Sequence, residues 1–136
     1  MTKHLIPILI LAAAAPVFAE DPHKLIATVP FNFTAGEKQF PAGDYAFIKN
    51  SSSNVISVRS ADAKNTAMLL TTSTVANRVA RAGSLLFLRI GQQYSLTEVW
   101  EPGTDRGSVV TPSKADRELR SRRDAPSRAR VSVALR

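Results

Sequence analysis

The amino-acid sequence predicts an all-β fold: a small antiparallel sandwich or barrel of about six to seven strands, followed by a short basic C-terminal helix. Two observations lead to this prediction. Apolar and polar residues alternate in a series of short segments, which is the pattern of half-buried strands. Turn-forming residues separate these segments at intervals of roughly 8–12 residues, as in small sandwiches and barrels. The pattern favours neither architecture over the other.

The first predicted strand covers Ile26–Phe33. Its apolar side chains Val29, Phe31 and Phe33 fall on one face, so the strand covers a core on that face. Pro30 interrupts the segment and has no N–H to donate to a neighbouring strand. We therefore expect this strand at an edge of the sheet, or with a bulge.

Two turns lead from this strand to the next. The first turn is predicted at Thr34–Glu37. The second, Phe40–Gly43, has proline in second place and glycine in fourth, which suits a type I turn. A strand is predicted over Asp44–Asn50, where alternation places Tyr45 and Phe47 on one face.

The central part of the chain continues this alternation of strands and turns. We expect a loop over Ala76–Ser84, which carries Arg78 and Arg81. The segment after it is apolar on both faces, which indicates a central strand that is covered on both sides. The strands predicted in this part are Val55–Ser60, Thr66–Val75, Leu85–Ile90 and Tyr94–Trp100.

The character of the sequence changes after Trp100. Ser113 suits the N-cap of a helix and Asp116 suits its first turn, so a short helix is predicted to begin here. The helix carries few apolar residues, and we expect it to dock weakly or not at all before Pro126 ends it. The last segment, Arg128–Arg136, alternates polar and apolar residues and is either a final strand or a frayed basic end.

The N-terminal residues have the build of a secretory signal peptide. Lys3 supplies a positive charge, Leu5–Ala15 is an apolar run of eleven residues, and Val17–Ala19 ends in a small residue. A membrane-spanning helix needs roughly 20 apolar residues, so this run is too short to span; an uncleaved amphipathic anchor or a buried helix is the alternative. We expect cleavage after Ala19 and a secreted or periplasmic protein. The predicted divisions are 1–19 as signal peptide, 20–112 as β domain, and 113–136 as basic C-terminal helix and tail.

The positive charge is concentrated in the tail. Residues 20–112 contain nine Lys/Arg and eight Asp/Glu, whereas residues 113–136 contain eight and three. A basic cluster suits an anionic partner, and export favours an envelope polymer or lipid headgroups over nucleic acid. The alternative is a solvated tail that aids solubility. The arginines concerned are Arg117, Arg120, Arg122, Arg123, Arg128 and Arg130.

The sequence offers little for catalysis, metal binding or cross-linking. It contains no cysteine, so the fold has no disulfide. His23 is the one histidine of the predicted mature chain, and no spacing of ligands suits zinc, so no metal or cofactor is predicted. The acids are scattered singly, which argues against the paired carboxylates of a glycosidase. We therefore predict a protein that is not an enzyme; the alternative is a hydrolase or isomerase that uses Glu98 or Asp44 in a cleft.

The aromatic residues of the β domain allow two interpretations. They line a pocket for an apolar ligand, as in some small barrels, or they fill the core that a domain without disulfides requires. The second interpretation is favoured. The residues concerned are Tyr45, Phe47, Phe87, Tyr94 and Trp100.

Four stretches in this order resemble a family of small secreted bacterial β-rich proteins of uncharacterised function. They are VPFNF at 29–33, FPAGDYAF at 40–47, SVRSADAK at 57–64 and LLFLRIGQQYSLTEVW at 85–100. Members typically read V-P-F-x-F, then L-P-A-G-x-Y, then L-x-F-x-R-x-G-x-x-Y-x-L-x-x-V-W. This chain has Phe40 where leucine is usual and Ala63 where the turn usually has glycine. The resemblance covers Val29 to about Leu119 and implies a secreted β-rich domain without implying an activity.

Together these observations predict an exported, non-enzymatic β domain that serves as a structural or interaction module of the cell envelope. The alternative within binding proteins is a small β-barrel that holds an apolar or lipid-like ligand.

Overall fold

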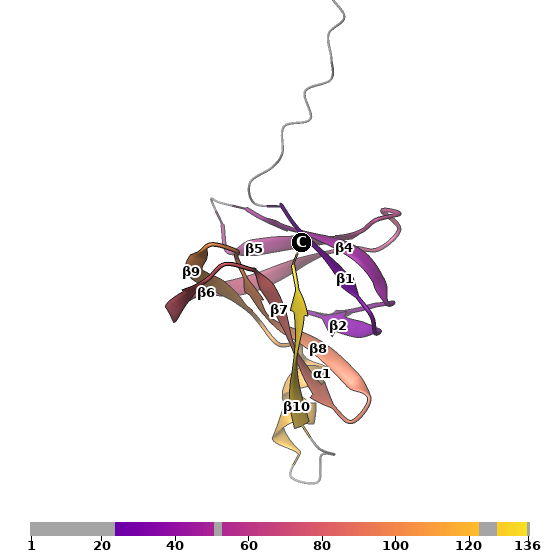
Figure 1. Ribbon diagram of the computed structural model, residues 1–136. Helices are drawn as coiled ribbons and strands as arrows, with labels where there is room; N and C mark the ends of the chain where they lie inside the picture. Colours follow the sequence, from indigo (N-terminus) through magenta and orange to yellow (C-terminus); the bar gives the residue numbers. More distant parts are fainter. Residues whose placement is uncertain (1–23, 51–52, 123–127, 136) are drawn as a thin grey trace, which may run out of the picture.

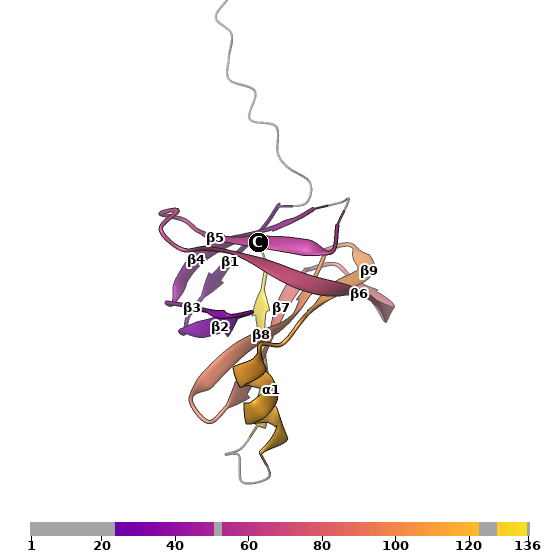
Figure 2. The same ribbon diagram turned by 180° about the vertical axis from the view of Figure 1, so that it is seen from behind.

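The computed structural model describes residues 24–50, 53–122 and 128–135. These residues form ten strands and one short helix (Figures 1 and 2). The strands are β1 Lys24–Val29, β2 Phe33–Ala35, β3 Lys38–Phe40, β4 Gly43–Lys49, β5 Val55–Ser60, β6 Thr66–Ala80, β7 Ser84–Ile90, β8 Gln93–Trp100, β9 Thr104–Val110 and β10 Arg128–Ala134, and the helix is α1 Lys114–Ser121.

The strands form one mixed, open sheet. Its main path runs β1-β4-β5-β6-β9-β8-β2-β3, and β7 joins β8 and carries β10. The pairs are antiparallel except for β2 with β8, which meet in parallel at Thr34 and Ser95. β1 and β10 lie near each other (Figure 1), but no pairing joins them in the described part of the chain. The sheet is therefore sandwich-like and not closed into a barrel.

The long strand β6 connects the two halves of the sheet. Its residues 66–70 pair with β5, and its residues 71–80 pair with β9, with an irregularity between Val75 and Ala80. Strands β1, β4 and β5 thus form one half, and β7, β8, β9 and β10 form the other. Figures 1 and 2 show the two halves turned toward each other, with the β2–β3 hairpin beside them.

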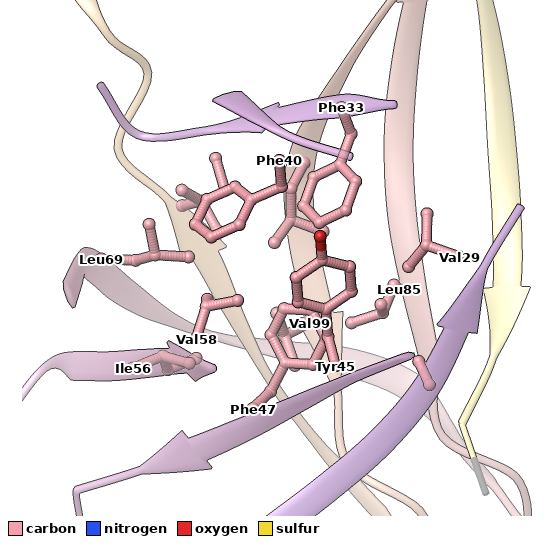
Figure 3. Close-up of a cluster of buried hydrophobic side chains, with 14 of the residues drawn as sticks. Val29, Phe33, Phe40, Tyr45, Phe47, Ile56, Val58, Leu69, Leu85 and Val99 are labelled. Atoms are coloured by element: carbon pink, nitrogen blue, oxygen red, sulfur yellow. The ribbon is translucent and has the colours of Figure 1, made fainter. Parts of the chain in front are cut away.

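The core lies between these two halves (Figure 3). Phe47 of β4 and Phe87 of β7 are 1% and 0% exposed, so the centre is filled from both halves. The β2–β3 hairpin adds Phe33 and Phe40, whose rings stack 5.3 Å apart, and both rings meet Tyr45 edge to face. Aromatic pairs in these arrangements add to the stabilisation that burial alone provides.

The predicted all-β fold with a short C-terminal helix is confirmed. The burial of β1 alternates as expected, with Ala27 and Val29 buried, and β1 stands at one end of the sheet path. Tyr45 and Phe47 are buried together on β4, and the strand predicted at Val55–Ser60 has those bounds. The segment predicted as a central strand is β7, which has a partner on each edge.

The strand predicted over Ile26–Phe33 is in fact two strands. β1 ends just before Pro30, which has no N–H to continue the pairing with β4. The chain resumes as β2, which pairs with β3 and β8 instead. The turn predicted at Thr34–Glu37 is shorter than expected, because it needs only Gly36 and Glu37; Gly36 has a φ of +59°, which glycine adopts without strain.

The loop predicted over Ala76–Ser84 is also wrong. β6 continues to Ala80, and β7 begins at Ser84. The sequence does not show this continuation at Asn77 and Arg78, because both residues are polar and exposed and therefore break the alternation of polar and apolar positions. The pairing with β9 extends the strand, and β9 was itself missed because Asp105, Arg106 and Gly107 give it little β propensity.

The C-terminal region contains the predicted helix. The structure also decides whether the last segment is a strand or a frayed end. Ser113 is the N-cap of α1, and its Oγ accepts a hydrogen bond from the N–H of Asp116 at 3.1 Å. No residue of α1 is buried, as expected for a weakly docked helix. The last segment is a strand: β10 pairs with β7 along its whole length, and Val131 and Val133 pack against the core.

Residues 1–19, the predicted signal peptide, lie outside the described residues, as does His23. Within the described ranges, no helix is long and apolar enough to cross a membrane.

The turn after β5 bears on the family resemblance. Ala63 stands where the family usually has glycine, and its φ is +59°. This left-handed conformation suits glycine far better than alanine, because alanine carries a Cβ. The backbone geometry therefore explains why glycine would be usual at this position.

Candidate functional site

The described surface has an open groove of about 600 Å³. Three elements border it: the β2–β3 hairpin, the turn between β7 and β8, and the start of α1 (Figure 2). We call this hollow the polar groove. Its lining consists of Asn32, Phe33, Thr34, Gly36, Glu37, Gln39, Phe40, Pro41, Gln92, Gln93, Tyr94, Ser113, Ala115 and Asp116.

A chain of hydrogen bonds ties these three elements together. Thr34 of β2 donates from Oγ1 to Ser95 Oγ at 3.1 Å, and Ser95 donates to Asp116 Oδ1 at 2.9 Å. Asp116 in turn donates its N–H to the Ser113 hydroxyl. Ser95 and Ser113 are buried, so these bonds are shielded from water. The network fixes the Asp116 carboxylate relative to both β2 and β8.

The rim formed by the hairpin is also held in place. Asn32 Oδ1 accepts a hydrogen bond from the N–H of Ala42 at 2.9 Å, and the Tyr45 hydroxyl donates to the carbonyl of Pro41. Burial raises the pKa of Tyr45, and the carboxylate of Asp62 adds a smaller effect in the same direction. The hydroxyl therefore stays protonated and keeps its hydrogen bond over a wide pH range.

Apolar and polar atoms contribute equally to the surface of the groove. Phe33 and Phe40 are only 2% and 1% exposed, because their rings point into the core. Tyr94 is half-buried, and its ring stacks on that of Phe31 with centroids 3.9 Å apart. A ligand would therefore meet apolar surface as well as amide, hydroxyl and carboxylate groups.

The lining of the groove is acidic. Glu37 and Asp116 are its two charged residues. The neighbouring Lys38 is directed elsewhere, since its Nζ donates to the carbonyl of Thr66 at 3.0 Å. The groove therefore favours neutral or cationic ligands, although the chain as a whole carries a formal charge of +7.

A second hollow of about 240 Å³ lies on the outer face of β7, β8 and β9. Leu86, Leu88 and Val109 form its apolar floor, and Arg120 of α1 and Arg130 of β10 stand at its border. We call this hollow the arginine cavity. It combines an apolar surface with two cationic groups and the carboxylate of Glu98.

Two of the six arginines predicted to bind an anionic partner thus meet at one site. Arg117 and Arg122 are exposed on and just after α1. Arg128 begins β10, and Arg123 lies outside the described residues. The predicted cluster is therefore divided among the described residues, with Arg120 and Arg130 bordering a common hollow.

The five aromatic residues that sequence reasoning grouped do not share one pocket. Tyr45, Phe47 and Phe87 fill the core. Tyr94 lines the polar groove, and Trp100 lies half-buried against β9. Gly107 makes room for Trp100, since a Cβ there would lie 2.5 Å from its ring.

The two acids considered for catalysis are not part of the polar groove's lining. Asp44 is exposed, and its carboxylate accepts a hydrogen bond from Thr28. Glu98 is half-buried, borders the arginine cavity, and accepts a hydrogen bond from Trp100 Nε1 at 2.7 Å. Among the described residues, no group of three His, Cys, Asp or Glu side chains is placed to hold a metal ion.

Sequence reasoning missed the residues that build the polar groove. Thr34, Ser95 and Asp116 are separated by many residues, and only the folded sheet brings them together. Gln92 and Gln93 carried the single usable signal, because they fall between the strands predicted at Leu85–Ile90 and Tyr94–Trp100, where a connecting turn exposes its polar residues. No local sequence pattern predicts that Gln92 and Gln93 lie beside α1.

Comparisons with protein-family models, with curated proteins and with solved structures found no match. The resemblance drawn from the four sequence stretches stays a prediction.

Proposed function

We propose that this protein is an exported, non-enzymatic β domain that acts as an interaction module of the cell envelope, with the polar groove as its binding surface. The observation that carries the proposal is the construction of the groove. Its walls come from three elements that the Thr34–Ser95–Asp116 hydrogen bonds hold in register. A ligand then binds without first ordering the site, which preserves affinity.

The groups in the groove suit recognition better than catalysis. Ser95 is buried and already donates to Asp116, and Thr34 already donates to Ser95, so these hydroxyls are committed to structure. The exposed amides of Gln39, Gln92 and Gln93 donate and accept hydrogen bonds but are poor acids and bases. A site of this composition holds a ligand and leaves it unchanged.

A second candidate function is supported by the arginine cavity: binding of an apolar or lipid-like ligand with an anionic end. Leu86, Leu88 and Val109 would contact the apolar part, and Arg120 and Arg130 the anionic part. The site for such a ligand is this outer cavity. The core itself is filled by side chains such as Phe47 and Phe87.

The test compares two variants of the full chain in a retention experiment. The groove variant carries Gln92→Ala and Gln93→Ala, and the cavity variant carries Arg120→Gln and Arg130→Gln. Each protein is immobilised and incubated with detergent-solubilised envelope and with purified wall fragments. We expect wild type and the cavity variant to retain envelope material, and the groove variant to lose it. Loss in the cavity variant alone would support the second candidate, and no retention by wild type would contradict both.

Export is tested separately by the intact mass of the protein recovered from the periplasm or the medium. The predicted mature chain begins at Glu20, and the uncleaved chain begins at Met1. A mass that includes residues 1–19 would contradict cleavage after Ala19.

A further inference from the structure

We propose that the polar groove binds a neutral, hydroxyl-rich chain, that is, an oligosaccharide segment of an envelope or extracellular glycan. This inference rests on the proposed function, because it names the ligand class of the same groove. Four properties of the groove support it: the chemistry of its amides, its charge, its rigidity and its lack of peptide-binding features.

The amide side chains match the hydrogen-bonding needs of sugar hydroxyls. The exposed residues Gln39, Gln92 and Gln93 line the groove, and each amide has one acceptor oxygen and one NH₂ donor in a plane, while Asn32 Oδ1 already accepts from Ala42. A hydroxyl both donates and accepts, so neighbouring hydroxyls on a sugar ring can engage both ends of one amide. The carboxylates of Glu37 and Asp116 add acceptors at two further positions.

The charge of the groove selects against anionic ligands. Glu37 and Asp116 are the charged groups of its lining, so a phosphate or carboxylate of a ligand would be repelled there. An anionic polymer would be drawn instead to the arginines, of which Arg120 and Arg130 border the other hollow. The ligand of the groove is therefore not anionic along the bound segment, and the amides favour a neutral, hydroxyl-bearing segment over a cationic one.

The site has the size and rigidity that such a ligand requires. Its volume of about 600 Å³ lies inside the range of small-ligand sites. Ser95 Oγ holds Asp116 Oδ1 at 2.9 Å, which aims the carboxylate while leaving acceptor capacity on it. Tyr94, supported from behind by Phe31, offers a partly exposed ring on which the apolar face of a sugar can lie.

A peptide ligand fits the groove less well. In the wall of the groove, β2 is paired with β3 and, at Thr34, with β8, and the outer strand β3 has only three residues, so the edge offered to an added strand is short. The rings of Phe33 and Phe40 are buried, so they form no pocket for the apolar anchors of a peptide. The groove therefore recognises its ligand mainly through hydrogen bonds from side chains in its walls. A glycan, with a hydroxyl on most ring carbons, forms more of these bonds than a peptide does.

The experiment is an NMR titration of the ¹⁵N-labelled mature chain. The probes are neutral hexaoses of glucose and of N-acetylglucosamine, a hexamer of galacturonic acid, and a lysine-rich peptide. The side-chain NH₂ signals of Gln92 and Gln93 report on the groove directly. We expect saturable shifts of these signals with at least one neutral hexaose and none with the galacturonic acid hexamer.

Matched variants identify the groups responsible. The Gln92→Ala, Gln93→Ala double variant should bind the same hexaose about tenfold more weakly, because two exposed hydrogen-bonding groups are lost. Asn77→Ala removes an exposed amide from β6, outside the groove, and should bind like wild type. Both variants change exposed side chains, so their folding is expected to be unaffected.

Each other outcome overturns the proposal in a distinguishable way. Shifts caused only by the peptide or by the acidic hexamer reject the neutral glycan but keep the groove as a binding site. No shift with any probe, while the groove variant still loses envelope retention, rejects the glycan class alone. No shift together with unchanged retention rejects both the ligand class and the proposed function.

Discussion

The polar groove and the arginine cavity are both lined by residues of one short helix, yet they have opposite character. Asp116 in the first turn of α1 lines the groove, and Arg120 one turn later borders the cavity. Residues four apart share a helix face, so the same face of α1 contributes an acid to one hollow and a base to the other. The two positions also follow the helix dipole, which favours acids at the first turn and bases at the last.

The difference teaches that overall charge is a poor guide to what this chain recognises. The basic tail suggested a single anionic partner. The fold instead divides the tail, because β10 returns to pair with β7 while α1 starts beside the groove. A binding role must therefore be considered separately for the polar groove and for the arginine cavity.

The largest expected effect tests whether the groove depends on the core behind it. Phe33→Ala should lower the free energy of unfolding by about 3–5 kcal/mol, because a buried ring that touches Phe40, Tyr45 and Phe87 is replaced by a void. Urea unfolding followed by Trp100 fluorescence measures this loss. Val79→Ala, on an exposed side chain, is the control and should change little. A small loss for Phe33→Ala would show that the groove wall folds independently of the core.

The corresponding test on the cavity side is Gly107→Ala. The added Cβ would lie 2.5 Å from the Trp100 ring, so we expect a loss of about 1–3 kcal/mol and altered fluorescence of this single tryptophan. Adding Trp100→Ala removes the clash. The double variant should therefore be more stable than the sum of the two single effects predicts. Additive losses would mean that Trp100 does not pack on Gly107.

Two substitutions on β8 test the polar groove and the arginine cavity separately, because each removes hydrogen bonds beside one of them. Ser95→Ala breaks the hydrogen bonds to Thr34 and Asp116, and Thr97→Val breaks the bond to the Leu86 carbonyl beside the arginine cavity. Each should cost about 1–2 kcal/mol. Hydrogen exchange at the start of α1 should become faster in Ser95→Ala only. Equal acceleration in both variants would show that α1 is not held by the groove network.

Alkaline pH offers a test of the rim of the groove. The pKa of Tyr45 is raised in the folded state from its ordinary value of 10.0, so the unfolded chain loses this proton first. The contribution of the Tyr45 hydroxyl to the free energy of unfolding is complete below pH 10. It is lost as the pH rises from there through the folded-state pKa. Tyr45→Phe should cost about 1 kcal/mol at neutral pH and flatten this alkaline decline. An equally steep decline in the variant, followed by urea unfolding across pH 8 to 12, would assign it to other groups.

The smallest expected effect is a gain in stability from a substitution at a residue that lines neither hollow. Ala63→Gly should raise the free energy of unfolding by about 0.5–1 kcal/mol, because the left-handed φ of Ala63 is strained for alanine and relaxed for glycine. Thermal unfolding measures the gain, and binding at either hollow should be unchanged. A loss of stability would mean that the greater freedom of glycine in the unfolded chain outweighs the relief of strain.

Most of the fold could be predicted from the sequence because alternation is a local signal. β4, β5, β7 and β8 were located from it, with Tyr45 and Phe47 on the inner face. β9 escaped because Gly107 is selected by its fit to Trp100 rather than by strand preference. β2 and β3 escaped because each has only three residues and draws its stability from Phe33 and Phe40 in the core.

The candidate site could not be predicted, because it depends on contacts between distant segments. Thr34 and Ser95 are 61 residues apart, and Asp116 is a further 21 residues along the chain. Local patterns identified the helix start at Ser113 and the exposed turn at Gln92 and Gln93. They carried no information that these segments meet.

The placement of β10 has a consequence for the order in which the molecule is completed. β7 lies in the middle of the second half, yet its outer partner is supplied by the last strand of the described chain. A chain that emerges from its N-terminus leaves that edge of β7 unpaired until residues 128–134 have followed. The pairing of the described sheet is therefore complete only once residues 128–134 have been added, and β7 keeps an open edge until then.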